Sequence, residues 1–172
     1  YTTKGTYFVK AHVSMGRGYG AGFAGAISKI LQVPKYEYGR IYNNLRYACS
    51  GALNMTYADF SNLAYEKGVT KFGLDNMFNG CRNLKTIIMP SDWIVENCAG
   101  IFNGCASLKS VDFIESWDIS NVKDMSNMFS GCENLLRVDF LTNWNINNVK
   151  SISGMFNCCK KLTEINFNPN TY

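Results

Sequence analysis

One pattern recurs four times between Met77 and Phe167 at nearly constant spacing. The four segments read MFNGCRNLKTIIM (77–89), IFNGCASLKSVDF (101–113), MFSGCENLLRVDF (128–140) and MFNCCKKLTEINF (155–167). Their shared cysteines are 24, 27 and 27 residues apart, at Cys81, Cys105, Cys132 and Cys159. A period of this length indicates stacked units, because each unit is too small to bury its own apolar face.

Each segment ends in a tail of the form Leu-x-x-Ile/Val-x-Met/Phe, which is the core signature of a leucine-rich repeat. The last two apolar positions have the two-residue spacing of a strand, so we expect short strands that stack in parallel along one face. The residues between them then point outward and form a mixed-charge surface without an aromatic platform for sugars. We predict a protein-binding surface there, at Lys85, Lys109, Asp112, Arg137, Asp139, Glu164 and Asn166. The alternative interpretation is that these are solvated strand residues.

The segments between the tails also repeat, since WDISNVKDMSNMF (117–129) and WNINNVKSISGMF (144–156) match position for position. Apolar residues recur there at every third position, which suits a short 3₁₀ or helical turn, or a tight β-arc, that packs inward opposite the strands. The corresponding segment 93–102 is three residues shorter. We therefore expect that coil to curve differently, with Cys98 in an irregular turn. The predicted fold is an α/β solenoid of stacked short parallel strands and short helical turns.

The N-terminal part of the chain departs from this pattern. Residues 47–76 look like a degenerate repeat, in which Cys49 matches the repeat cysteine with one residue inserted before Leu53. The solenoid then spans 47–172, with regular repeats over 77–167. Residues 1–46 hold seven basic residues and one acidic residue, and their alternation over 5–15 predicts a strand. We interpret 1–46 as a small β-rich cap or attachment segment.

The proposed attachment residues are rich in tyrosine and arginine, which favour interfaces: Arg17, Tyr36, Tyr38, Arg40 and Tyr42. The same residue types would equally serve to cover the open end of a solenoid, and both interpretations remain open. The glycines Gly20, Gly22 and Gly25 spell G-x-G-x-x-G before a short helix expected over 26–33. Because Pro34 ends that helix and repeats follow, we interpret the glycines as a closely packed loop and predict no cofactor.

Cysteine usage points to packing. Seven cysteines cannot all pair within one chain, and four of them recur beside Leu and Phe, where a small apolar side chain is wanted. We expect a buried ladder of reduced thiols. The chain has no C-x-x-C and one histidine, His12, far away in sequence, so we predict no metal site.

The repeats resemble the BspA-like leucine-rich-repeat surface proteins, in particular their 26–27-residue "surface protein" repeat type. The positions that fit that motif are Trp117, Asp118, Ser120, Val122, Met125, Met128, Phe129, Cys132, Leu135, Val138 and Phe140. The match covers about 77–167 and departs at 93–98, at Asn145, at Asn147 and throughout 1–76. The resemblance implies a right-handed solenoid and non-enzymatic roles in surface adhesion, host or matrix binding and protein–protein contact.

Together these observations predict a non-enzymatic interaction module. The chain lacks a G-x-S-x-G motif, a P-loop and a metal triad, so we predict that it is not an enzyme. We expect an adhesin-like protein at the cell surface or outside the cell that binds a protein partner through its repeat face. The alternative is a structural component of a viral or phage particle or appendage, joined to its neighbours through the N-terminal segment and the last coil. Nucleic acid is the less favoured partner, and no apolar run reaches the roughly 18 residues of a membrane span.

Overall fold

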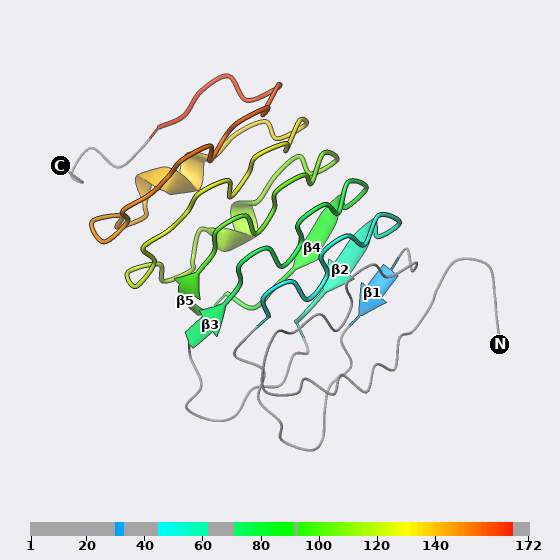
Figure 1. The fold of residues 1–172 in the computed structure, drawn as a ribbon, viewed down its shortest axis with the longest axis horizontal. Helices are drawn as coiled ribbons and strands as arrows, with labels where there is room; N and C mark the ends of the chain where they lie inside the picture. The colour runs from blue at the N-terminus through cyan, green and yellow to red at the C-terminus, as the bar shows by residue number, and fades with distance from the viewer. Residues whose placement is uncertain (1–29, 33–44, 62–70, 92, 167–172) are drawn as a thin grey trace, which may run out of the picture.

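The computed structural model describes residues 30–32, 45–61, 71–91 and 93–166, and in these the chain winds through successive coils stacked on one another (Figure 1). The strands of this part are β1 (Ile30–Gln32), β2 (Tyr57–Asp59), β3 (Lys71–Gly73), β4 (Thr86–Ile88) and β5 (Ile94–Asn97). Two 3₁₀ helices, η1 (Asp112–Ile114) and η2 (Asp139–Thr142), follow, and the described residues contain no α-helix.

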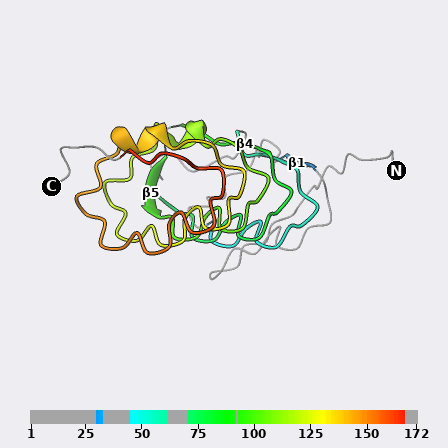
Figure 2. The ribbon, with the colours of Figure 1, turned by 90° about the horizontal axis from the view of Figure 1, so that it is seen from above.

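All strand pairing in the described part is parallel and joins one coil to the next. The order β1-β2-β4 forms one sheet, in which Leu31 pairs with Ala58 and Ala58 with Ile87. A second sheet pairs β3 with β5. Seen from above, β1, β4 and the 3₁₀ helices lie along one long side of the coils, and β5 lies toward one end (Figure 2). Each coil therefore presents the same repeat positions on the same side.

β1 lies in the segment for which we expected a short helix. Ile30–Gln32 instead forms a strand in register with β2, and Leu31 is buried. The helix prediction was wrong here because pairing with the next coil decides the local structure. Strand β1 is thus stacked with the repeats, although it lies within residues 1–46.

The register of the first repeat also differs from the prediction. The amide of Cys49 donates to the carbonyl of Met77 (2.8 Å), as the amide of Phe78 donates to that of Ile101 (2.9 Å). Cys49 therefore occupies the phenylalanine position of the repeat, and Ala52 occupies the cysteine position. No residue is inserted. The error arose because alanine and cysteine are both small enough for this fully buried position.

The expected strands at 111–113 and 138–140 are replaced by the starts of η1 and η2. Ile114 donates to the carbonyl of Val111 (3.0 Å) and Leu141 to that of Val138 (3.1 Å), which gives a three-residue period. Both Ile114 and Leu141 are fully buried. A second apolar residue directly after the tail thus turns the chain inward.

The shortened segment keeps its place in the core. Cys98 is fully buried and takes the position that Met125 fills in the next coil. The amide of Asn76 donates to the carbonyl of Ala99 (2.9 Å), and the amide of Gly100 donates to the carbonyl of Ser126 (2.9 Å). These bonds show which positions of neighbouring coils are equivalent. The three missing residues fall before Cys98, where β5 runs straight into the next turn.

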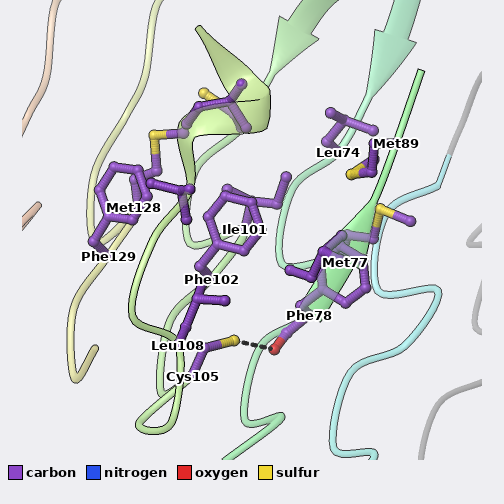
Figure 3. Packing of buried hydrophobic residues seen from close by; sticks show 14 of the residues in the cluster. Leu74, Met77, Phe78, Met89, Ile101, Phe102, Cys105, Leu108, Met128 and Phe129 are labelled. Carbon is purple, nitrogen blue, oxygen red and sulfur yellow. Dashed lines mark hydrogen bonds between the residues drawn. The ribbon is translucent and has the colours of Figure 1, made fainter. Parts of the chain in front are cut away.

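The core consists of columns of identical repeat positions. The rings of Phe78, Phe102 and Phe129 stack at centroid distances of 5.9 and 5.6 Å, and Phe156 continues the row at 5.6 Å. Figure 3 shows Phe78, Phe102 and Phe129 of this row beside Leu108 and Cys105. Because these side chains are fully buried up to Phe129, the columns supply the apolar burial that stabilises the stack.

The repeat cysteines form a second column of free thiols. Cys105 donates its Sγ hydrogen to the carbonyl of Phe78 (3.2 Å) in the preceding coil (Figure 3), and Cys132 does the same to Phe102 (3.2 Å). The predicted burial is confirmed at Cys81, Cys105 and Cys132, whereas Cys159 is half-buried.

This column predicts a selective pattern of thiol alkylation. Burial raises the pKa of Cys81 and of Cys159 to about 11. Since the thiolate is the reactive form and only about 0.1% of either thiol is ionised at pH 8, both should react slowly. We expect iodoacetamide to modify the exposed Cys158 alone at pH 8, with Cys159 following as the pH approaches 11. Peptide mapping by mass spectrometry checks this, with the urea-unfolded chain as control for all seven thiols. Fast modification of Cys132 in the folded chain would contradict the assigned column.

Cys158 ends a column of left-handed glycines. Gly80, Gly104 and Gly131 have φ of 78°, 74° and 72°, and Cys158 has φ of 59° at the same repeat position. A side chain in this conformation costs roughly 1–2 kcal/mol, so we expect Cys158→Gly to raise the free energy of unfolding by about 1 kcal/mol.

The matched control is Gly131→Ala, whose new Cβ would lie 3.3 Å from the Cα of Gly104 at positive φ. We expect this substitution to destabilise the chain in the same urea titration. A less stable Cys158→Gly variant would show that the thiol contributes more than the strained backbone costs.

Candidate protein-binding surface

The predicted binding residues lie on the side of the coils that carries β4, η1 and η2. Three consecutive coils expose side chains within 85–88, 109–112 and 136–139. We call these exposed positions the tail face. Lys85 directly precedes β4, and Asp112 and Asp139 are the first residues of η1 and η2. The strand setting predicted for the two aspartates was wrong, but both are exposed, while the same 3₁₀ turns bury Ile114 and Leu141.

Backbone bonds between coils align the tail face. The amide of Ser107 donates to the carbonyl of Arg82 (3.1 Å), which joins the coils of Lys85 and Lys109, and the amide of Leu136 donates to the carbonyl of Lys109 (3.2 Å). Lys85, Lys109 and Leu136 therefore follow one another in a column across three coils. Neighbouring segments at hydrogen-bonding distance are about 4.8 Å apart, so the column forms a dense and regular array.

Arg137 brings three of the predicted residues together. Its guanidinium lies 3.6 Å from a carboxylate oxygen of Asp112 in the preceding coil and 3.6 Å from one of Asp139 in its own coil. The three side chains are more than half exposed, so each pair contributes roughly 0–1 kcal/mol. A partner can open these pairs at little cost.

A shallow depression of about 350 Å³ is lined by Lys85, Ser107, Lys109 and Asn134. Nδ2 of Asn134 donates to the carbonyl of Ala106 (2.7 Å), which holds the amide at the rim. Ser107 and Asn134 were not among the predicted binding residues. Their signal was available, because both occupy the polar repeat position two residues after the cysteine.

The tail face also exposes aliphatic side chains. Leu136 is 52% exposed and Ile88 is 39% exposed, among charged neighbours. The other predicted residues lie one coil further on, where Nδ2 of Asn166 donates to Oε1 of Glu164 (3.0 Å). These two residues pair with each other rather than with the Arg137 network.

Several candidates of the sequence analysis lie outside the described residues. These are the attachment residues Arg17, Tyr36, Tyr38, Arg40 and Tyr42, the glycines Gly20, Gly22 and Gly25, and His12. Within the described ranges, no three His, Cys, Asp or Glu side chains gather as metal ligands would, and no helix is long and apolar enough to span a membrane.

The repeat region matches one family of proteins. The family described as "Mycoplasma protein of unknown function, DUF285" matches residues 69–171. The chain belongs to this family. The DUF285 match begins just before β3 and contains every residue of the tail face. No curated protein and no solved structure matches the chain.

Local hydrogen bonds in the DUF285 region explain two of the departures from the repeat motif, at Asn145 and Asn147. Oδ1 of Asp118 accepts the amide of Ser120 (2.9 Å), and Oδ1 of Asn145 accepts the amide of Asn147 (3.1 Å). Asparagine thus makes the same local turn as aspartate. The hydrogen bond from Ser120 lowers the pKa of the Asp118 carboxyl, so this turn stays ionised at neutral pH.

Proposed function

We propose that this chain is a non-enzymatic, adhesin-like module at the cell surface or outside the cell, whose tail face binds a protein partner. Its coils would form a right-handed leucine-rich-repeat solenoid of the BspA-like type. The observation that carries the proposal is the exposure of Leu136 and Ile88 among the charges of the tail face.

Interface chemistry supports this reading of the tail face. Arginine is enriched at protein interfaces, and exposed aliphatic side chains beside it supply the apolar area that becomes buried on binding. Arg137 sits next to Leu136 and is held by two exposed carboxylates. Because the coils are stacked and hydrogen-bonded, the face is presented by a rigid scaffold, which lowers the entropy cost of binding.

A second candidate function is assembly into a larger particle or appendage. It is favoured by the last described coil, where Ile152 is 46% and Ile165 is 41% exposed and Phe156 is half-buried. Apolar side chains gathered at this end of the coils suit a contact with a neighbouring subunit.

The test compares two double variants in affinity enrichment from the native source. Leu136→Glu with Arg137→Glu alters the tail face, and Lys123→Glu with Lys150→Glu alters an exposed pair on adjacent coils elsewhere. We expect the first variant to enrich one specific protein at least about tenfold less than the wild type does, which corresponds to a loss of about 1.4 kcal/mol in binding free energy. The second variant should enrich that protein as the wild type does. Thermal melts establish that both variants fold.

A partner that binds the wild type and both variants equally would overturn the tail-face proposal. If that partner is a second copy of the chain or a particle protein, the assembly function is favoured. The enriched protein is then purified and its binding to the three chains is measured directly.

A further inference from the structure

Two lysines of the tail face line the same depression. Lys85 and Lys109 belong to adjacent coils, and both side chains are exposed. Among the described residues neither forms an ion pair, whereas the nearby Arg137 is paired twice. Two like charges on adjacent coils repel each other, and an anion bound in the depression that both lysines line would be attracted by both.

The carboxylates near the depression are already engaged. Asp112 pairs with Arg137 at 3.6 Å, and Glu133, next to Asn134, pairs with Lys160 at 3.0 Å. The positive charge of the depression is therefore not compensated by these groups. Ser107 and the second amide proton of Asn134 add neutral donors at its rim.

The surroundings favour a carboxylate over a polyanion. Arg137 is shared by the two carboxylates of Asp112 and Asp139, so this network keeps one net negative charge and would repel a nucleic acid or a sulfated polysaccharide that runs across the face. A protein segment with one or two acidic side chains meets the lysines without crossing that acidic border. The exposed Leu136, which follows Lys109 in the same column, then contacts an aliphatic residue of the segment.

We propose that the depression between Lys85 and Lys109 receives acidic side chains of a partner protein, followed in the partner by an aliphatic residue over Leu136. This inference rests on the proposed function and names the chemistry of the partner's contact segment.

The probe is a fluorescein-labelled peptide, Gly-Glu-Val-Glu-Leu-Gly with blocked ends, and the reference is the same peptide with Gln in place of Glu. Binding is measured by fluorescence anisotropy at low salt, and the amide shifts of 85, 107, 109 and 134 are followed by NMR. We expect the Glu peptide to bind at least about fivefold tighter than the Gln peptide, and its affinity to fall with added salt.

The charge-matched variants are Lys85→Gln with Lys109→Gln and, as control, Lys123→Gln with Lys150→Gln, a second lysine pair on adjacent coils. The first should lower the affinity for the Glu peptide about five- to tenfold, and the second less than about twofold. Equal loss in both variants, or equal affinity for both peptides, overturns the inference. So does a heparin oligosaccharide that binds more tightly than the Glu peptide and is lost with Lys85 and Lys109.

The same variants separate this inference from the proposed function. If Lys85→Gln with Lys109→Gln keeps the natural partner while Leu136→Glu with Arg137→Glu loses it, the tail face binds protein without the acidic contact. If both variants keep the partner, the proposed function fails as well.

Discussion

Replacing Phe102 with alanine is expected to lower the free energy of unfolding by about 3–5 kcal/mol, as for large aromatic deletions in cores. Phe102 is fully buried in the middle of the ring column. Its ring stacks on Phe78 at 5.9 Å and on Phe129 at 5.6 Å, and meets the edge of Phe113 at 6.0 Å. The substitution leaves a cavity that hydrogen-bonded coils on both sides cannot close.

The matched variant is Phe156→Ala, in the half-buried last position of the same column. Its ring stacks on Phe129 at 5.6 Å and has solvent nearby, so we expect a loss of about 1–2 kcal/mol. Urea titrations followed by far-ultraviolet circular dichroism give both values. Equal losses for the two variants would contradict the column.

Leu135→Ala is expected to cost about 2–5 kcal/mol, the range for buried leucine deletions. Leu135 is fully buried, and its amide donates to the carbonyl of Cys132 (3.1 Å) in the turn that leads into the tail. This turn places Leu136 outside and Leu135 inside. The prediction therefore tests the register that exposes the tail face.

Leu162→Ala is the control, because Leu162 holds the same repeat position but is half-buried. We expect it to cost less than half as much in the same titration. A change below about 1 kcal/mol for Leu135→Ala would mean that the tail is registered differently and that the assigned outward positions are wrong.

For the regular repeats from Met77 onward, the repeat period was sufficient to predict which residues share a column, whereas it failed for Cys49 in the degenerate repeat. Leu84, Leu108 and Leu135 are buried as expected, and the thiols of Cys105 and Cys132 make equivalent bonds one coil apart. A column is a backbone position repeated by stacking, so a fixed sequence period translates directly into neighbours in space.

The local conformation was harder to predict than the column. Val111-x-Phe113 and Val138-x-Phe140 carry the strand period, yet the extra buried residues Ile114 and Leu141 pull the chain into 3₁₀ turns. The coil of β4 has Pro90 at that place and keeps its strand. The deciding information lay one residue beyond the motif.

The candidate site was predicted in part for the same reason. Outward positions follow from the alternation of the tail, so Lys85, Lys109 and Arg137 were found. The ion pairs of Arg137 and the depression depend on how far long side chains reach across coils, which a period does not specify. Ser107 and Asn134 approach the lysines only because adjacent coils stack.

Lysine cross-linking with mass spectrometry in the native source tests most directly whether the tail face binds a protein. We expect cross-links from Lys85 or Lys109 to one defined partner protein, and their loss in the Leu136→Glu, Arg137→Glu variant. Cross-links confined to Lys4, Lys10, Lys29 or Lys35, joining copies of the chain or particle proteins, would contradict this expectation and identify an assembly component.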